Sequence, residues 1–527
     1  MAPTSSSLLH SPLLNFEPGQ ERKTAVAWPA GSITYNELRG PVLRIATRLR
    51  KSGIGQGCRV AVCLPKCVEA VQVILGVLAS GAAYVPLAAS SPVQYIHKQV
   101  QDAQAGLLVT TPRIRSLLAT ACPAKDCPPS VTVSGIDTGH GLDPWIGDVL
   151  AAELPVIDPE DQAAILYTSG TTGEPKGVVL SHRNILSFVE WAIARFGLSP
   201  EDRFVSHAPF YFDLSTLDLF ATLRLGAAVF LLNEKLVLFP QAVAQAVRAQ
   251  RCSIWYSVPT ALRFLLEHGR LEHGGLPSLR TIFFAGEVFP LADLRKLMGL
   301  LPGPRYVNLY GPTETNVCTY HILPGPPDEK QAEIPIGLPC EHLEVGLRGE
   351  NGRPPAAGRA GEIWVAGPSV MRGYWRRPDL TRAVRLNRRD DSFLTGDFGA
   401  LGSDGRFFFR GRRDRQVKIR GHRVELTEIE SVLASCPGAS QAVVVGHGLE
   451  SLNPRLIAFI VPALEAALSA TTLRRFCAGR LPSHAVPASF FVRSGLPLLP
   501  NGKVDRARLT EWAAEAMTKE SRERKTS

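Results

Sequence analysis

The feature that most constrains the fold of this chain is the alternation of strand-like and helix-like apolar patterns over most of its length. Short apolar runs at residues 59–64, 106–110 and 281–284 alternate with helical segments between about residues 20 and 370. Such alternation predicts an α/β fold with β-sheets flanked by helices. The length of 527 residues, with 45% hydrophobic and 20% charged residues, is that of a globular protein with several folding units.

The pattern changes near residue 400. A turn signal at residues 403–406 and a charged stretch at residues 411–415 precede about 100 residues with a helix and strand pattern of their own. We therefore expect a large N-terminal body of several subdomains (1–410), a linker (411–415), a small α+β domain (416–515) and a tail (516–527). The segment from Arg415 onward carries 16 lysines and arginines against 10 acidic residues, and thus more than half of the net charge of +10.

The basic balance permits an anionic partner, but the sequence does not favour nucleic acid or a membrane. Long Lys/Arg runs and periodic aromatic–basic patterns are absent from the sequence. The apolar stretch at residues 68–87 contains Glu69, Gln72 and Pro86, and predicts a buried helix followed by a strand. The ten cysteines form no Cys-x-x-Cys pair, which is typical of reduced thiols in a cytoplasmic protein.

Residues 167–177 read Tyr-Thr-Ser-Gly-Thr-Thr-Gly-Glu-Pro-Lys-Gly and directly follow a strand-like run. Glycines let backbone N–H groups approach phosphate oxygens, and hydroxyl and ammonium groups add further donors. The order of residues differs from the Walker A loop, which ends in Gly-Lys-Ser/Thr. A flexible surface turn is the alternative, but a nucleoside triphosphate is the natural ligand for such a loop. The candidate ligands are Thr168, Ser169, Gly170, Thr171, Thr172, Gly173 and Lys176.

This loop resembles the phosphate loop of adenylate-forming enzymes, which include acyl-CoA synthetases, luciferases and the adenylation domains of nonribosomal peptide synthetases. Residues 308–315, 394–397, 411–425 and 500–505 resemble further motifs of that family, in the family's order. The resemblance spans residues 34–503 and departs from the family pattern at Asn316 and at His484, where tyrosine is frequent. It implies ATP and Mg²⁺, and a mobile small domain that rotates about Asp414.

The resemblance also implies a role for individual residues. Lys503 bridges the substrate carboxylate and ATP, and Thr313 bonds the α-phosphate. Glu314 is the Mg²⁺ ligand. Tyr310 stacks on adenine, Asp397 binds the ribose, and Arg412 contacts ribose or phosphate. Asn308 and Gly311 belong to the same ATP-binding motif as Tyr310. Lys176 is a further catalytic residue.

Residues 207–215 resemble the Phe-Asp-x-Ser form of family members that activate amino acids. Asp213 would pair with the substrate ammonium, because a buried cation needs a charge partner. The bare sequence also favours Asp213 as the N-cap of a following helix, and the two roles can coexist. The family's pocket positions fall on Asp213, Leu214, Leu217, Tyr256, Phe283, Ala285, Leu309 and Val317, together with Lys503.

Apart from the acid and one tyrosine hydroxyl this set is apolar, so a polar substrate side chain would lose its hydration without compensation. The set resembles the pocket of stand-alone enzymes that adenylate proline. We therefore expect conversion of L-proline to prolyl-AMP with release of pyrophosphate, then transfer to the phosphopantetheine thiol of a separate carrier protein. The alternatives are another small apolar amino acid, an acyl-CoA synthetase and a non-catalytic binding homologue.

Overall fold

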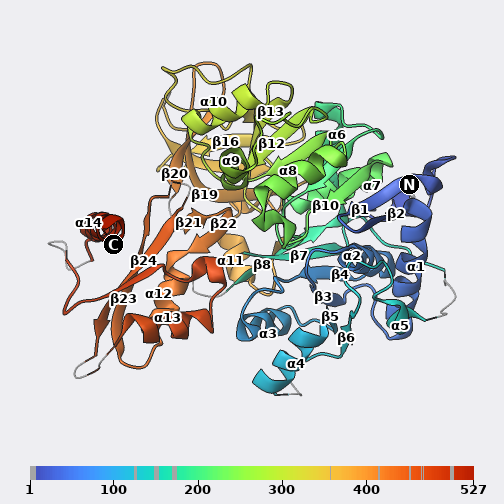
Figure 1. Cartoon of the computed structure of the whole chain (residues 1–527), viewed down its shortest axis with the longest axis horizontal. Coiled ribbons are helices and arrows are strands. Elements are labelled where there is room, and N and C mark those ends of the chain that lie inside the picture. Colours follow the sequence, from blue (N-terminus) through green and yellow to red (C-terminus); the bar gives the residue numbers. More distant parts are fainter. Residues whose placement is uncertain are drawn as a thin grey trace. The chain divides into compact units, whose positions relative to one another are not determined.

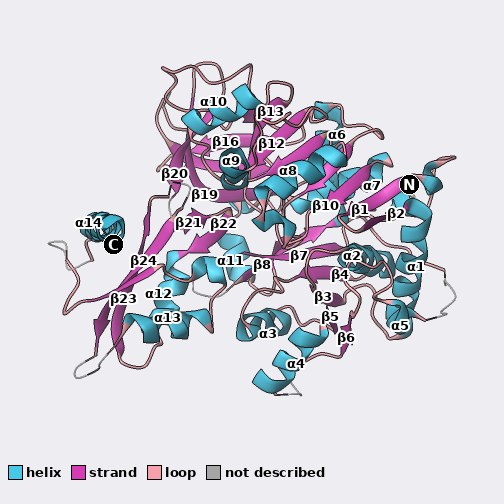
Figure 2. Ribbon diagram, in the orientation of Figure 1, coloured by secondary structure: helices cyan, strands magenta, loops and turns pink. Residues whose placement is uncertain are grey.

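The computed structural model describes residues 8–123, 127–147, 153–168, 175–356, 358–412, 416–449, 451, 453–463, 466, 468–498 and 504–526. The chain divides into two compact units. The first consists of residues 1–89, 96–167 and 177–413, and the second of residues 90–95, 168–176 and 414–527. Helices and strands are mixed throughout both units (Figures 1 and 2), which confirms the predicted α/β class.

The large sheet of the first unit runs in the order β15-β14-β13-β12-β11-β9-β10-β1-β2. The strands from β13 to β1 in this order pair in parallel, and β14, β15 and β2 pair antiparallel at the two ends. The strands are β1 (Thr24–Trp28), β2 (Gly31–Thr34), β9 (Arg203–Ser206), β10 (Ala228–Leu231), β11 (Ile254–Ser257), β12 (Thr281–Ala285), β13 (Arg305–Tyr310), β14 (Thr319–Ile322) and β15 (Leu338–Pro339).

Two more sheets complete the first unit. One has the order β18-β8-β7-β4-β3-β5-β6 and is parallel at each pairing with a described register except β8–β18, and the other, β16-β17-β19-β20, is antiparallel. The strands are β3 (Arg59–Cys63), β4 (Ala83–Pro86), β5 (Leu107–Thr110), β6 (Ser130–Thr132), β7 (Gln162–Thr168), β8 (Lys176–Ser181), β16 (Glu344–Arg348), β17 (Gly361–Ala366), β18 (Gly373–Tyr374), β19 (Ser392–Leu401) and β20 (Phe407–Arg412).

Side-chain alternation along the strands gives the large sheet a separate core on each face. On β11, Ile254 and Tyr256 belong to the core cluster that includes α1, α2, α6 and α7, whereas Trp255 belongs to the cluster with α8, α9 and α10. The helices are α1 (Tyr35–Lys51), α2 (Val68–Ser80), α3 (Val93–Asp102), α4 (Pro112–Ala121), α5 (Asp143–Ile146), α6 (His182–Phe196), α7 (Ser215–Leu225), α8 (Pro240–Ala249), α9 (Pro259–His268), α10 (Leu291–Leu300) and α11 (Pro378–Ala383).

The second unit has its own core on both faces of a sheet in the order β23-β24-β25. Alternate residues of β23 and β24 pack against α12 and α13 on one face and against α14 on the other (Figure 1). A hairpin of β21 and β22 precedes this sheet. The elements are β21 (Gln416–Ile419), β22 (His422–Glu425), α12 (Leu426–Ala434), β23 (Ala439–His447), β24 (Arg455–Pro462), α13 (Ala470–Ala478), β25 (Ser489–Val492) and α14 (Arg506–Thr526).

Local sequence signals explain why α1 and α2 begin and end where they do. Thr34 and Glu37 form a reciprocal capping box at the start of α1. The helix α2 ends at Gly81, which adopts φ +88°, and the predicted strand follows directly. At Gly76 a Cβ would lie 2.4 Å from Cγ2 of Ile45, so glycine permits the close packing of α1 on α2. Among the described residues, none of the helices has the length and apolar character needed to cross a membrane.

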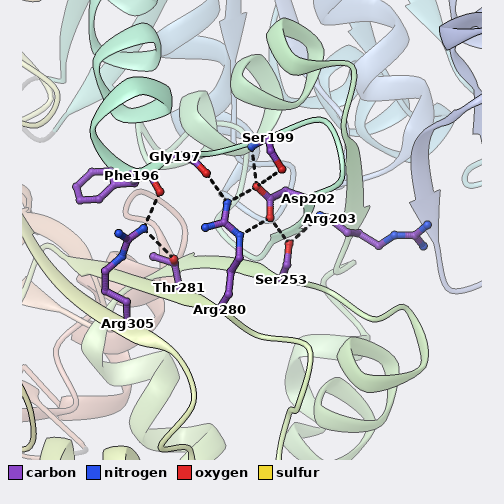
Figure 3. Close-up of polar contacts among 9 residues, drawn as sticks. All are labelled: Phe196, Gly197, Ser199, Asp202, Arg203, Ser253, Arg280, Thr281 and Arg305. Atoms are coloured by element: carbon purple, nitrogen blue, oxygen red, sulfur yellow. Dashed lines mark hydrogen bonds and ion pairs between the residues drawn. The ribbon is translucent and has the colours of Figure 1, made fainter.

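A polar network lies at the amino ends of the parallel strands of the large sheet (Figure 3). Asp202 accepts hydrogen bonds from Arg280 Nε and Ser253 Oγ, each at 2.7 Å, and the Arg280 guanidinium also donates to the Gly197 carbonyl at 2.9 Å. Although burial alone would raise it, the hydrogen bonds from Arg280 and Ser253 lower the pKa of Asp202. The network therefore fastens β9, β11 and β12 at one end, which leaves their carboxyl ends for other groups.

Two buried histidines predict that the first unit loses stability in mild acid. Burial lowers the pKa of His10 to about 4 and that of His182 to about 3. Both rings stay neutral in the folded state, whereas the unfolded chain binds protons below about pH 6.5. The stability that these histidines confer is therefore complete above pH 6.5 and declines as the pH falls towards 4, by about 2 kcal/mol for one such group at pH 5.

The measurement is the decrease in Tm between pH 7 and pH 5 for the wild type and for His182→Leu. We expect the decrease to be smaller in the variant, because it no longer has this titrating group. The exposed His273 provides the control variant, His273→Leu, which should keep the wild-type decrease. Equal decreases in all three proteins would contradict the prediction.

Candidate functional site

The residues expected to surround the amino acid come together at the carboxyl ends of the parallel strands. In open α/β sheets this edge is where ligands bind. Tyr256 on β11 pairs in register with Phe283 on β12, and Ala285 at the end of β12 pairs with Leu309 on β13. Leu214, Leu217, Tyr256, Phe283, Ala285, Leu309 and Val317 all belong to one core cluster, in which Leu217 and Phe283 have no exposed surface.

Asp213 lies in the loop between β9 and α7 and is half-buried. The prediction that it caps the following helix is wrong, because α7 begins at Ser215 and its N-cap position is Leu214, with no side-chain cap. In that turn the Asp213 carbonyl accepts hydrogen bonds from Thr216 N and Oγ1. Burial raises the pKa of Tyr256, and the nearby negative charges of Asp213 and Asp218 raise it further. Asp213 therefore lies close to the apolar set.

Tyr310, Asp397 and Arg412 form a second group at the end of β13. The Tyr310 hydroxyl donates to Asp397 Oδ2 at 2.7 Å, and Arg412 Nη1 lies 2.6 Å from Asp397 Oδ1. Asp397 on β19 and Arg412 on β20 are register partners, so strand pairing sets their ion pair. Arg412 was expected in a linker, but the structure places it as the last residue of β20. A nearly buried carboxylate is thus held between a cation and a hydroxyl.

A tight turn after β13 positions Glu314. At Gly311 a Cβ would lie 1.7 Å from the Asn316 carbonyl oxygen, so no larger residue fits this turn. Asn316 has φ +58°, which asparagine tolerates, and its amide donates to Thr216 Oγ1 at 3.2 Å. Glu314 is almost fully buried and its Oε1 accepts a hydrogen bond from the Tyr374 hydroxyl at 2.7 Å. The carboxylate therefore has a fixed orientation.

Sequence reasoning did not find Tyr374. It follows Gly373 in the short strand β18 and precedes Trp375, where a tyrosine usually packs as an aromatic residue. A sequence shows no difference between a buried tyrosine that only packs and one that donates to a carboxylate 60 positions away. Of the other residues in the same motif, Asn308 donates its side-chain amide to the Pro335 carbonyl at 3.0 Å, and Thr313 is half-buried.

Several predicted site residues lie outside the described residues. Thr168 is the last residue of β7 and Lys176 the first of β8, but Ser169, Gly170, Thr171, Thr172 and Gly173 between them are not described. Asp414 and Lys503 also lie outside. On either side of Lys503, Leu498 and Val504 form an isolated antiparallel bridge, and Asp505 N donates to the Pro497 carbonyl at 2.8 Å. The described residues just before and just after Lys503 therefore lie next to each other.

Comparison with protein families gives two matches in this chain. Residues 17–375 match the model described as AMP-binding enzyme. Residues 428–503 match the model described as AMP-binding enzyme C-terminal domain. The two matches together extend from before β1 to Lys503.

Individual proteins resemble the chain over nearly its full length. An L-proline–[L-prolyl-carrier protein] ligase of Pseudomonas fluorescens is 37% identical over 95% of this chain and 98% of its own length. A ligase of the same name from Streptomyces coelicolor is also 37% identical, over 90% of this chain and 91% of its own. The solved structure of the amide bond synthetase McbA from Marinactinospora thermotolerans superposes with a TM-score of 0.84, at 26% identity, over 96% of this chain and 99% of its own.

The turn at Gly311 gives a sharp test of the nucleotide-binding prediction. Gly311→Ala places a methyl group against the Asn316 carbonyl, so the turn that carries Thr313 and Glu314 must shift. We expect ATP affinity, measured by isothermal titration calorimetry, to fall about tenfold or more, because a shift of this kind costs at least about 1.4 kcal/mol. Thermal stability should decrease as well.

The matched control is Gly299→Ala in α10, where a Cβ would meet nothing within 4 Å. Alanine at an open helical position is neutral or slightly stabilising. This variant should therefore bind ATP as the wild type does. Unchanged ATP affinity in a folded Gly311→Ala protein would contradict the assignment of this turn to the nucleotide.

Proposed function

The chain belongs to the family of AMP-binding enzymes, and from that premise we propose that it is an L-proline–carrier protein ligase. It activates L-proline with ATP to prolyl-AMP and then transfers the prolyl group to the phosphopantetheine thiol of a separate carrier protein. The observation that carries this proposal is the likeness, over at least 90% of each chain, to two ligases with that named activity.

The side chains around Asp213 support proline as the substrate. Its carboxylate is the charge partner for the secondary ammonium, which offers two N–H donors. The rest of the set is aliphatic or aromatic and lies in one core cluster, which suits a compact hydrocarbon ring. A charged or amide side chain there would lose its hydration and gain no hydrogen bond.

The second group accounts for ATP. Asp397 receives the ribose hydroxyls, and Arg412, whose Nη1 lies 2.6 Å from Asp397 Oδ1, holds the carboxylate in place for that purpose. Tyr310, whose hydroxyl is fixed by Asp397, presents its ring to the adenine. Thr313 bonds the α-phosphate, and the loop from Thr168 to Lys176 holds the β- and γ-phosphates. Thr313, Asp397, Tyr310 and the loop assignments follow the family motifs.

Glu314 fits a magnesium ion that is shared with the triphosphate. Among the described residues, groups of three or more His, Cys, Asp or Glu side chains that could hold a metal are absent. Mg²⁺ commonly binds through one or two carboxylates together with substrate phosphates, so a single oriented carboxylate is a suitable protein ligand. When bound, the ion neutralises part of the triphosphate charge.

The first reaction forms a mixed anhydride. A carboxylate oxygen of proline attacks the α-phosphorus, the bond from that phosphorus to the bridging oxygen breaks, and pyrophosphate leaves with the electron pair. Lys503 neutralises the charge that develops between carboxylate and phosphate, which is electrostatic stabilisation of the transition state. Holding both reactants in one site removes much of the entropic barrier.

The second reaction transfers the prolyl group. The carrier's thiol, as thiolate after losing its proton to solvent, attacks the carbonyl carbon of prolyl-AMP, a thioester bond forms and AMP leaves. By analogy with the family, the small domain turns about Asp414 between the two reactions and withdraws Lys503. The two reactions therefore depend on different faces of that domain.

The substrate assignment is tested by amino-acid-dependent ATP–pyrophosphate exchange over all proteinogenic amino acids and pipecolate. Proline should give the highest kcat/KM. Asp213→Asn should lower kcat/KM for proline about 100-fold, because the ammonium loses its buried charge partner. Asp379→Asn, at an exposed acid on α11, is the control and should leave the exchange unchanged. A profile led by another amino acid would refute proline.

The separation of the two reactions is tested with Lys503→Ala. Adenylate formation should slow by about 100-fold or more, because a charge is missing in the transition state. Transfer to the carrier from supplied prolyl-AMP should keep its wild-type rate. The exposed Lys330 provides a control, Lys330→Ala, in which both rates should be normal. Equal loss of both rates in the Lys503 variant would overturn the division of roles.

A further inference from the structure

Lys66 is a buried lysine for which the reaction described above has no use. It lies between β3 and α2 and is 5% exposed. Lysines are almost never fully buried unless they are paired, because the ammonium gives up its hydration. Burial lowers the pKa of Lys66 to about 7 in spite of the opposing charges of Asp218 and Glu234. The partners of Lys66 must therefore compensate for the hydration that its ammonium group loses.

The closest partners are two backbone carbonyls at the carboxyl end of β9. Lys66 Nζ donates to the Ser206 carbonyl and to the Ala208 carbonyl, each at 2.6 Å. The ring of Phe210, two residues further along, has its centroid 5.4 Å from Nζ. Three residues after Phe210 the chain reaches Asp213. Lys66 thus holds the first part of the loop that carries Asp213, which we call the acid loop (residues 206–213).

Asp218 on α7, beyond the acid loop, lies close enough to Lys66 for each group to affect the pKa of the other. It has no exposed surface. Burial raises its pKa, while the Lys66 ammonium and the Ser206 hydroxyl oppose that rise. The neighbouring His207 is neutral, because burial and the Lys66 charge lower its pKa to about 3, and its Nδ1 lies 2.9 Å from Ser257 Oγ. Lys66 is therefore surrounded by groups that belong to the acid loop and its adjoining elements.

The same charges reach the candidate amino-acid site. Tyr256 experiences the negative charges of both Asp213 and Asp218, which raise its pKa in addition to burial. Asp218 is thus near enough to affect the pKa of both Lys66 and Tyr256, and Tyr256 is likewise near Asp213. Because Ser206 and Ala208 precede Asp213 by only a few residues, we expect a displacement of the loop at these carbonyls to change the position of Asp213.

From this arrangement we propose that Lys66 is a positioning residue for the amino group of the substrate. Its hydrogen bonds to two carbonyls hold the acid loop in a position where the Asp213 carboxylate can pair with the ammonium group of the amino acid. Because the hydrogen bonds of Lys66 go to carbonyls of the acid loop, we expect its effect to fall on recognition of the amine. The inference rests on the proposed role of Asp213. It predicts that substitution of Lys66 raises the KM for the amino acid much more than the KM for ATP.

The test is a set of variants in ATP–pyrophosphate exchange, with KM measured separately for the amino acid and for ATP. Lys66→Met removes the donors and the charge and keeps most of the side-chain volume. We expect its KM for proline to rise about tenfold or more and its KM for ATP to change less than about twofold. Lys66→Gln keeps an N–H₂ group and should fall between Lys66→Met and the wild type.

A second measurement uses the competitive inhibitor cyclopentanecarboxylate, which has the ring and carboxylate of proline but no amine. Its Ki should be the same for Lys66→Met as for the wild type, because Asp213 has no ammonium to meet. A merely structural loss would weaken proline and this analogue together. That outcome, or a proline KM that stays unchanged in folded Lys66→Met and Lys66→Gln, would overturn the proposal.

The control is Arg280→Met, which removes a partly exposed cation near the amino end of the same sheet, where Arg280 holds Asp202 just before β9 (Figure 3). It should lower Tm and leave the KM for the amino acid unchanged. If the wild type activates another amino acid best, the proposed substrate fails. The Lys66 variants are then measured with that amino acid and its des-amino analogue, so the two failures are distinguishable.

Discussion

Parallel pairing of β9, β11, β12 and β13 is the constraint on which the candidate site depends. Pairing in register places Tyr256 beside Phe283 and Ala285 beside Leu309 at one edge of the large sheet. The loops that leave this edge carry Asp213 and Glu314, and β13 itself ends at Tyr310. Residues from distant parts of the sequence therefore meet because parallel strands all finish on the same side.

Buried charge is used at both ends of β9, for different purposes. At the amino end, Arg280 neutralises Asp202 and Ser253 donates a hydrogen bond to it, so that neighbouring strands are joined. At the carboxyl end, Lys66 donates to the carbonyls of Ser206 and Ala208, where the chain leaves the sheet. Asp397 is a third buried charge with fixed partners, because one of its oxygens pairs with Arg412 and the other accepts a hydrogen bond from Tyr310. In each case the geometry is stiff, because breaking one partner leaves a charge buried without compensation.

The sequence predicted the elements that depend on local signals. It did not predict contacts between residues that lie far apart in the sequence. The helix and strand within residues 68–87 and the turn at residues 403–406, which joins β19 to β20, each depend on a short stretch of sequence, and the structure confirms them. The N-cap expected at Asp213 was wrong because the N-cap position is Leu214, a shift of one residue that no local signal fixes. Tyr374 and Lys66 were missed because their partners lie 60 and 140 positions away.

The second unit encloses a core of its own. Both clusters that cover β23 and β24 draw their described side chains from residues 417–517, so folding of that core needs no side chain from the first unit. A module of this kind can be exchanged between related chains by recombination near residues 413–415 without opening a core. Selection can then adapt the small module to a new partner while the recognition of the activated acid is inherited unchanged.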